Sequence, residues 1–160
     1  MQISIFAVGR MKSGAEQKLV QHYLGRFSKS SGAIGFHLKK VQEVPESHAQ
    51  TARQRMEEEG RRLIEFLPEK CRLIVLDERG ESISSVAFAK KLGCYRDEGI
   101  RDVVIALGGP DGHNEQIRNR ADFLLSFGLM TWPHQIARIL LTEQLYRTVT
   151  IANHHPYHRF

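Results

Sequence analysis

Apolar positions along the chain follow two alternating spacings, which predict strands separated by helices. Short apolar runs that suit strands cover residues 3–8, 34–44, 71–77, 102–107 and 123–127. Helical spacing covers residues 13–29, 48–67, about 82–95, about 114–120 and about 133–152, and Ser82 is the expected N-cap of the third helix. Strands that alternate with helices are typical of an α/β fold with a mostly parallel sheet between helices. We therefore predict one α/β domain over residues 1–160.

Three predicted strands end in segments that could bind a ligand, because ligands of parallel sheets lie beyond the carboxyl ends of the strands. These segments begin at Leu76, at Gly108 and at Gly128. Gly108 and Gly109 would let a ligand approach the backbone, although the same pair also suits a tight turn. The glycine loop matches neither the dinucleotide fingerprint nor the Walker A motif, which disfavours an NAD enzyme and excludes a P-loop.

The loop after the last strand mixes small and large apolar residues. Its members are Gly128, Leu129, Met130, Thr131, Trp132 and Pro133. Backbone groups of such a loop are free to bind an adenine edge, and its apolar lining would suit a purine or a thioether. The same residues also suit a loop that packs into the core, and the sequence alone favours neither interpretation.

The final helix is apolar on more than one face, which indicates that it is central to the domain or packs on a second subunit. We favour a dimer interface. Glu143 and Arg147 can pair at the i,i+4 spacing. Arg138 has no such partner along the helix and is therefore the better functional candidate.

The chain ends in His154-His155-Pro156-Tyr157-His158-Arg159-Phe160, an unusual concentration of rings and titratable groups. A metal site is disfavoured, because no Cys, Asp or Glu nearby completes a ligand set. We predict instead that the rings stack on bases and that Arg159 contacts phosphate.

Charge supports a nucleic-acid partner only modestly. The net charge is +5, and residues 1–56 hold nine Lys and Arg against three Glu, so the excess lies in the N-terminal third. That excess suits either an ordinary solvated face or a surface that follows phosphates. We find no membrane span and no signal peptide, so we expect a cytoplasmic protein in which Cys71 and Cys94 stay reduced.

Five motifs, in order and at matching spacing, resemble the RlmH family of SPOUT-class methyltransferases. They are Leu76-Asp77, Gly108-Gly109-Pro110-Asp111-Gly112, Leu129-Met130-Thr131-Trp132-Pro133-His134, Glu143-Gln144-Leu145-Tyr146-Arg147 and His155-Pro156-Tyr157-His158-Arg159. The resemblance covers the whole chain. His154 departs from the Asn or Gly that the family usually carries, and Trp132 replaces smaller aliphatic residues.

This resemblance implies a C-terminal trefoil knot, a homodimer through the knotted region, and methylation of N3 of a pseudouridine in large-subunit (23S) ribosomal RNA. The methyl donor would be S-adenosylmethionine, and the RNA would be met in the large subunit or the 70S ribosome. The alternative from another class is a ribosome- or RNA-binding module without enzymatic activity.

By the same resemblance, two groups of residues form the site. The cofactor group is Leu76, Gly108, Gly109, Gly128, Leu129, Met130, Thr131, Trp132 and Pro133, with Leu129 and Trp132 excluding water. The catalytic group is Arg138, His155, Tyr157, His158 and Arg159. His155 and His158 are the candidate bases, while Arg138 and Arg159 would hold phosphate or the target base. The tail of one subunit would lie near the cofactor of the other.

Overall fold

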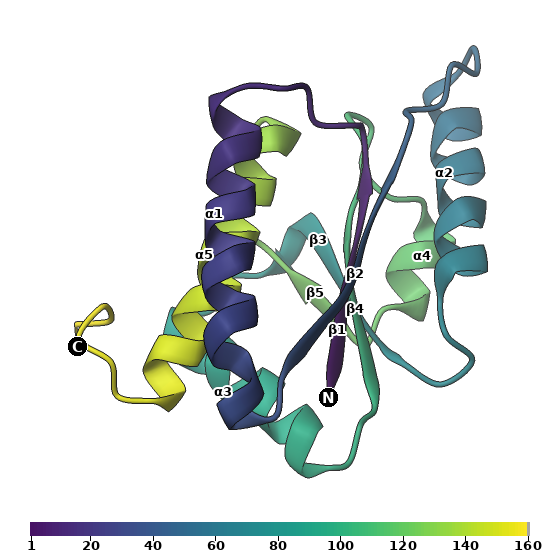
Figure 1. The fold of residues 1–160 in the computed structure, drawn as a ribbon. Helices are drawn as coiled ribbons and strands as arrows, with labels where there is room; N and C mark the ends of the chain where they lie inside the picture. The colour runs from purple at the N-terminus through teal and green to yellow at the C-terminus, as the bar shows by residue number, and fades with distance from the viewer. Residues whose placement is uncertain (160) are drawn as a thin grey trace.

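The computed structural model describes residues 1–159 and contains a five-stranded parallel sheet with helices on both faces (Figure 1). The strands are β1 (Gln2–Val8), β2 (His37–Val44), β3 (Arg72–Glu81), β4 (Asp102–Leu107) and β5 (Phe123–Leu125). The helices are α1 (Ala15–Ser30), α2 (Ala52–Phe66), α3 (Ser85–Asp97), α4 (Glu115–Arg120) and α5 (His134–Ala152). The strand order is β2-β1-β4-β3-β5, and every neighbouring pair is parallel. The predicted α/β class is confirmed.

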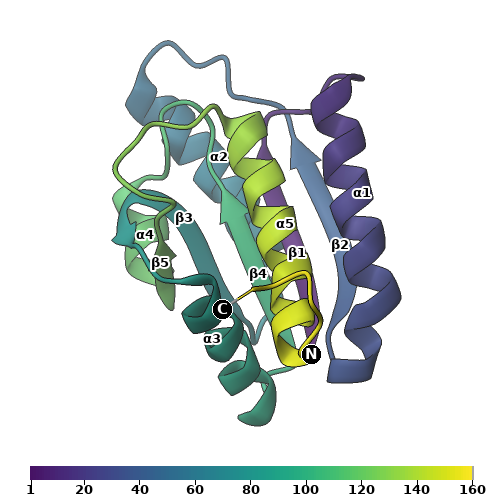
Figure 2. The ribbon, with the colours of Figure 1, turned by 90° about the vertical axis from the view of Figure 1, so that its left-hand side faces the viewer.

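Alternation along β1 explains why both faces of the sheet are covered. Ile3 and Ile5 are fully buried in the cluster that includes residues of α1, α3 and α5. Phe6 points to the other face and joins a second cluster with Leu63 of α2 and Ile117 of α4. Figures 1 and 2 show the same division, with α1, α3 and α5 on one side of the sheet and α2 and α4 on the other.

The central position of α5 accounts for its apolar character on several faces. It packs against α1, against α3 and against the sheet, and Leu141 and Leu145 are fully buried there. The place of α5 in the middle of the domain is therefore sufficient to explain its apolar faces, without contact with a second subunit. The face that carries Ile136, Ile139 and Leu140 stays only half-buried in the single chain.

The strand predicted over 34–44 begins later than its apolar alternation suggested. Ser31–Ile34 form a 3-10 helix, and Gly35 has a φ of 75°, a left-handed conformation that favours glycine. Phe36 is nevertheless buried at 1% exposure, so its apolar character reflects packing rather than strand structure. The strand itself starts at His37.

Two helix starts were also placed wrongly by sequence. Helix α2 begins four residues after His48, because Thr51 and Gln54 form a reciprocal capping box. Helix α3 is capped by Ser84, whose hydroxyl accepts from the backbone N–H of Ala87, and not by Ser82. Strand β3 continues to Glu81, which leaves no room for a helix start at Ser82.

Strand β3 makes an outward excursion before it ends. Leu76 and Glu81 both pair with Leu125, so residues 77–80 leave the ladder and return to it. Gly80 permits the return, since a Cβ there would lie 2.7 Å from the backbone carbons of Leu124 and Leu125. The excursion carries Asp77 beyond the carboxyl edge of the sheet.

Candidate active site

The carboxyl ends of β3, β4 and β5 surround a pocket of about 260 Å³. It is lined by Leu76–Arg79, Leu107–His113, Arg118, Leu125–Gly128, Met130–Trp132, His134 and Ala137. The three strand-end segments singled out in the sequence therefore meet at one place. Seven of the nine residues expected to hold a cofactor line it, and the exceptions are Leu129 and Pro133.

Leu129 corrects one expectation, because it does not shield the pocket from water. The residue is 102% exposed and is not among those that line the pocket. Met130 is also exposed, at 74%, but it does contribute to the lining.

The glycine loop is shaped by close contacts with its own chain. Gly109 and Gly112 form an isolated antiparallel bridge, with the Gly112 N–H donating to the Gly109 carbonyl at 2.9 Å. A Cβ at Gly109 would lie 3.0 Å from Val8 Cγ1 and from Glu59 Oε2. Glycine is thus needed at position 109 because the loop packs on β1 and α2, which is a different reason from ligand access.

The loop over 128–133 offers backbone donors that the protein does not use. The Ser126 hydroxyl accepts from the Gly128 N–H, and Trp132 Nε1 donates to the Phe127 carbonyl at 3.3 Å. Within residues 1–159, the N–H groups of Leu129, Met130 and Thr131 find no protein acceptor. Exposed N–H groups in a short irregular loop suit the polar edge of a heterocycle.

A second pocket of about 390 Å³ shares the wall that Trp132 and Leu125–Gly128 form. Its other lining residues include Ile83, Phe88 and Leu140, so it is mostly apolar. The second pocket is therefore the more apolar of these two adjoining pockets.

Three polar side chains line the first pocket close to one another, namely Asp77, His113 and Arg118. The Asp77 side chain is 7% exposed, and its Oδ2 lies 3.8 Å from Arg118 Nη1. Arg118 also donates to the carbonyl of His113. Sequence reasoning missed His113 and Arg118, although His113 directly follows the glycine loop and could have been noticed there.

His113 is held in its neutral form. It is 5% exposed, and burial lowers its pKa to about 4, against opposing effects of Asp77 and the Ala106 carbonyl. Nε2 has no partner within the described residues and lies 3.1 Å from where a Cβ on Gly108 would stand. The ring therefore packs behind the glycine loop without adding charge to the pocket.

We expect His113 to make the protein less stable in acid. In the unfolded chain a histidine titrates near pH ~6.5, so between about pH 6.5 and about 4 the unfolded state binds a proton that the folded state lacks. The free energy of unfolding should therefore fall as the pH drops through this window, by roughly 3 kcal/mol at its lower end. Urea unfolding of wild type and His113→Leu from pH 7 to 4 should show a flatter dependence in the variant.

His48→Leu is the matched control for this measurement, because His48 is exposed in a loop. Its curve should run parallel to that of the wild type. If the His113→Leu curve also ran parallel, the buried imidazole would not be the titrating group.

Arg138 is not placed to bind phosphate, which corrects the role expected for it. The residue is 1% exposed, and its guanidinium donates to Glu43 Oε1 and, at 2.7 Å, to the carbonyl of Gly9. Burial lowers the pKa of Arg138, and the carboxylate of Glu43 opposes that shift. Its missing helical partner is supplied across the fold by β2, so Arg138 joins α5 to the ends of β1 and β2.

The C-terminal tail folds back on the far end of α5. Tyr157 donates to Glu143 Oε1 at 3.0 Å, and its ring lies 4.9 Å from that of Tyr146. The guanidinium of Arg147 lies over the Tyr157 ring at 4.9 Å. Partial burial is the largest of the effects that raise the pKa of Tyr157, so its hydroxyl stays protonated. Phe160 lies outside the described residues.

In the tail, His155 and His158 both use Nδ1 as an acceptor. His155 Nδ1 accepts from the Tyr157 N–H at 3.1 Å, and His158 Nδ1 lies 3.3 Å from Arg147 Nη1, which can only donate. A neutral imidazole whose Nδ1 accepts carries its proton on Nε2. In this arrangement the ring of His155 presents an N–H donor, which suits holding a base better than removing its proton.

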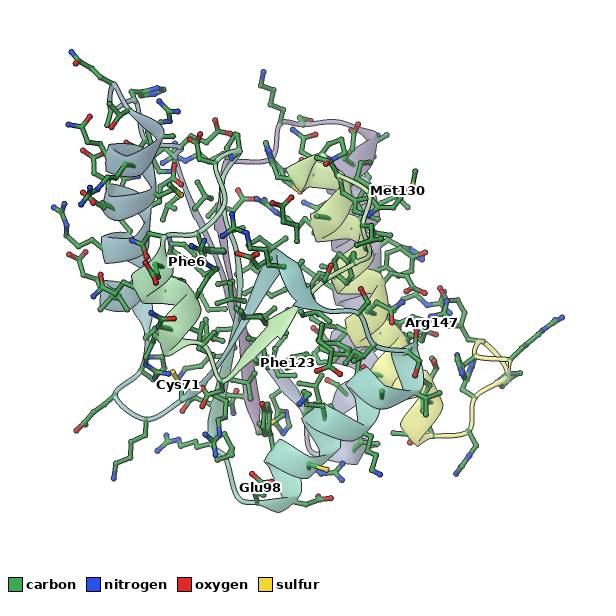
Figure 3. All side chains as sticks on the ribbon, turned by 180° about the vertical axis from the view of Figure 1, so that it is seen from behind. Phe6, Cys71, Glu98, Phe123, Met130 and Arg147 are labelled. Atoms are coloured by element: carbon green, nitrogen blue, oxygen red, sulfur yellow. The ribbon has the colours of Figure 1, made fainter. Side chains whose placement is uncertain are left out.

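Tail and pocket lie apart in the single chain. Tyr146, which packs on Tyr157, comes twelve residues after His134 at the pocket end of α5, or roughly 18 Å along the helix axis. In Figure 3 the label of Met130 stands beside one end of α5, and that of Arg147 stands near the other end and the tail. The structure thus brings together the predicted cofactor residues but not the predicted catalytic ones.

No group of three or more His, Cys, Asp or Glu within residues 1–159 could hold a metal ion. None of the helices described there is long and apolar enough to cross a membrane.

Comparison with known proteins places this geometry in context. Residues 1–158 match the sequence model of the family described as "Predicted SPOUT methyltransferase". The Bartonella tribocorum protein named Ribosomal RNA large subunit methyltransferase H is 92% identical over 160 residues, which is 100% of both chains. Proteins of the same name are 81% identical in Bartonella henselae, over 100% of both chains, and 53% identical in Brucella anthropi, over 99% of both chains.

Among solved structures, a probable methylase family protein from Haemophilus influenzae Rd KW20 aligns with a TM-score of 0.52 at 13% sequence identity. The alignment covers 95% of this chain and 66% of that chain, and the likeness concerns the fold alone.

Proposed function

Because this chain belongs to the SPOUT methyltransferase family, we propose that it transfers a methyl group from S-adenosylmethionine to large-subunit ribosomal RNA. One observation carries the proposal: relatives with that activity in their name align along the entire chain at up to 92% identity. The pocket at the carboxyl ends of β3, β4 and β5 is where a parallel sheet binds a small ligand.

The residues of the pocket fit such a donor. The free N–H groups of Leu129, Met130 and Thr131 can read the edge of adenine, and the glycine loop leaves backbone exposed on the opposite wall. Trp132 and Met130 provide apolar surface for the carbon groups around the sulfur. When bound, S-adenosylmethionine supplies an electrophilic methyl carbon on a sulfonium.

We propose N3 of a pseudouridine as the acceptor. The N3 proton would pass to solvent water, and the electron pair left on N3 would bond the methyl carbon of the bound donor, whose carbon–sulfur electron pair would return to sulfur and leave neutral S-adenosylhomocysteine. The residues of the chain must then hold the acceptor in line with the breaking bond, so positioning supplies most of the rate enhancement. Arg159 can contact phosphate, and Tyr157 holds the tail against Glu143.

A homodimer would bring tail and pocket together. The tail of one chain packs on α5 at Glu143 and Tyr146, beyond Ala137, the last α5 residue that lines its own pocket, so a site that uses both is best completed by a second copy. The half-buried face with Ile136, Ile139 and Leu140 and the exposed Leu129 offer apolar surface for that contact. The C-terminal trefoil knot stays a prediction.

The competing function is an RNA-binding module without activity, and one experiment separates the two. Ribosomes from a strain that lacks the enzyme are incubated with purified protein and S-adenosylmethionine, and their RNA is mapped by mass spectrometry of nuclease fragments. We expect one added methyl group in one 23S fragment, with free RNA, large subunits and 70S ribosomes as parallel substrates. Ligand should also raise Tm, because only the folded chain binds it.

Absence of both the methyl group and the thermal shift would leave RNA binding without catalysis. Methylation at a position other than pseudouridine N3 would keep the enzyme class and overturn the proposed target.

A further inference from the structure

Asp77 has unused capacity to bind a cation. Its side chain is 7% exposed, and the only hydrogen bond it receives within the described residues comes from the Arg79 N–H, at 2.9 Å. A carboxylate offers about four acceptor positions, and a buried one is costly unless it is paired. Arg118 forms an ion pair with Asp77 at 3.8 Å, but this distance is beyond hydrogen-bonding range, so the carboxylate keeps acceptor positions for another donor.

Arg118 has unused donors in the same pocket. Within residues 1–159 its guanidinium donates one hydrogen bond, from Nη1 to the His113 carbonyl. That bond fixes the side chain. A guanidinium has five N–H groups, and the others of Arg118 stay available to an anion. Both Asp77 and Arg118 line the pocket. A carboxylate that can bind a cation and a guanidinium that can bind an anion therefore lie side by side in it.

The surroundings preserve this pair of opposite charges. The ring of His113 is uncharged near neutral pH, so it does not repel a bound cation. Asp111, another lining residue, is already paired with Arg55 at 2.7 Å. Glu78 and Arg79 also line the pocket but are exposed to solvent, which weakens their charges.

We propose that Asp77 and Arg118 bind the zwitterionic amino-acid end of S-adenosylmethionine, with Asp77 accepting from its ammonium group and Arg118 donating to its carboxylate. This assignment rests on the proposed function and adds to it the orientation of the bound S-adenosylmethionine. The amino-acid end lies between β3 and α4, and the adenine end lies toward the loop over 128–133.

The test compares two ligands that differ only at the amino-acid end. S-adenosylhomocysteine and 5′-methylthioadenosine both have a neutral sulfur, and only the first carries the ammonium and carboxylate. Calorimetry gives the Kd of each for wild type, Asp77→Asn and Arg118→Gln. The control variants are Asp97→Asn at the exposed end of α3 and Arg120→Gln on the same helix as Arg118, both outside the pocket.

We expect Asp77→Asn and Arg118→Gln each to weaken S-adenosylhomocysteine about tenfold or more, as for loss of one charge-assisted hydrogen bond, with 5′-methylthioadenosine unchanged. Arg118→Lys should recover part of the loss, and the control variants should change neither Kd. Equal weakening of both ligands would mean that the two residues only support the fold. No weakening would place the amino-acid end elsewhere. Either result overturns the assignment, whereas a wild type that binds neither ligand overturns the proposed function itself.

Discussion

Removal of residues 155–160 should lower the rate of ribosomal RNA methylation about a thousandfold or more, with little change in affinity for S-adenosylhomocysteine. The tail carries His155, His158 and Arg159, yet its described contacts are with α1 and α5, far from the pocket of its own chain. Loss of the tail therefore removes groups that position the RNA without touching the cofactor residues. Single-turnover methylation of ribosomes and calorimetry measure the two effects separately.

The truncated chain needs a check on folding, because Tyr157 packs on Tyr146. Its urea unfolding should remain cooperative, and Tyr157→Phe should keep the ring contact while losing the bond to Glu143. His48→Ala, a change at an exposed histidine elsewhere, should leave turnover unaffected. Full turnover by a folded truncated protein would remove the tail from the mechanism.

Glu43→Gln should destabilise the fold by about 3 kcal/mol, the cost of leaving a buried charge without its partner. Arg138 would remain 1% exposed with only neutral acceptors, namely the new amide oxygen at position 43 and the carbonyls of Val8 and Gly9, because Glu43 is the carboxylate that it contacts. Glu43 also accepts from the Met11 N–H, so the start of the segment after β1 would loosen as well. Equilibrium unfolding in urea measures the change.

The matched control is Glu57→Gln, which breaks the Arg53–Glu57 pair on the surface of α2. Both side chains of that pair are well exposed, so its loss should cost less than about 0.5 kcal/mol. If the two variants lost similar stability, the Glu43–Arg138 pair would be no more important than a surface ion pair.

Element type could be predicted from the sequence far better than element ends. The five strands and five helices were all anticipated, because periods of two and 3.6 residues are set by backbone geometry. Ends depend on single side-chain contacts, such as the choice of Ser84 over Ser82 as the cap of α3. The excursion of β3 could not be predicted, since it depends on the fit of Gly80 against β5.

The backbone loops of the candidate site could be predicted from the sequence, whereas the partners of its charged side chains could not. Glycines after a buried strand indicated the pocket, although the structure requires Gly109 for the packing of its loop on β1 and α2. The partners of Arg138 could not be found, because Glu43 is distant in sequence and meets it only across the fold. The pairing of Asp77 with Arg118 was hidden for the same reason.

The pairing of β1 with β4 sets the timing of folding during synthesis. Gln2 lies opposite Asp102, so the first strand to be made finds this neighbour only after about a hundred residues have been translated. Until then β1 has only β2 beside it, and the face meant for α5 remains bare. About sixty residues separate the end of β2 from the start of β4. At 5–20 residues per second, the nascent chain therefore spends roughly 3–12 s in that state before β4 can join, a period in which chaperone contact matters most.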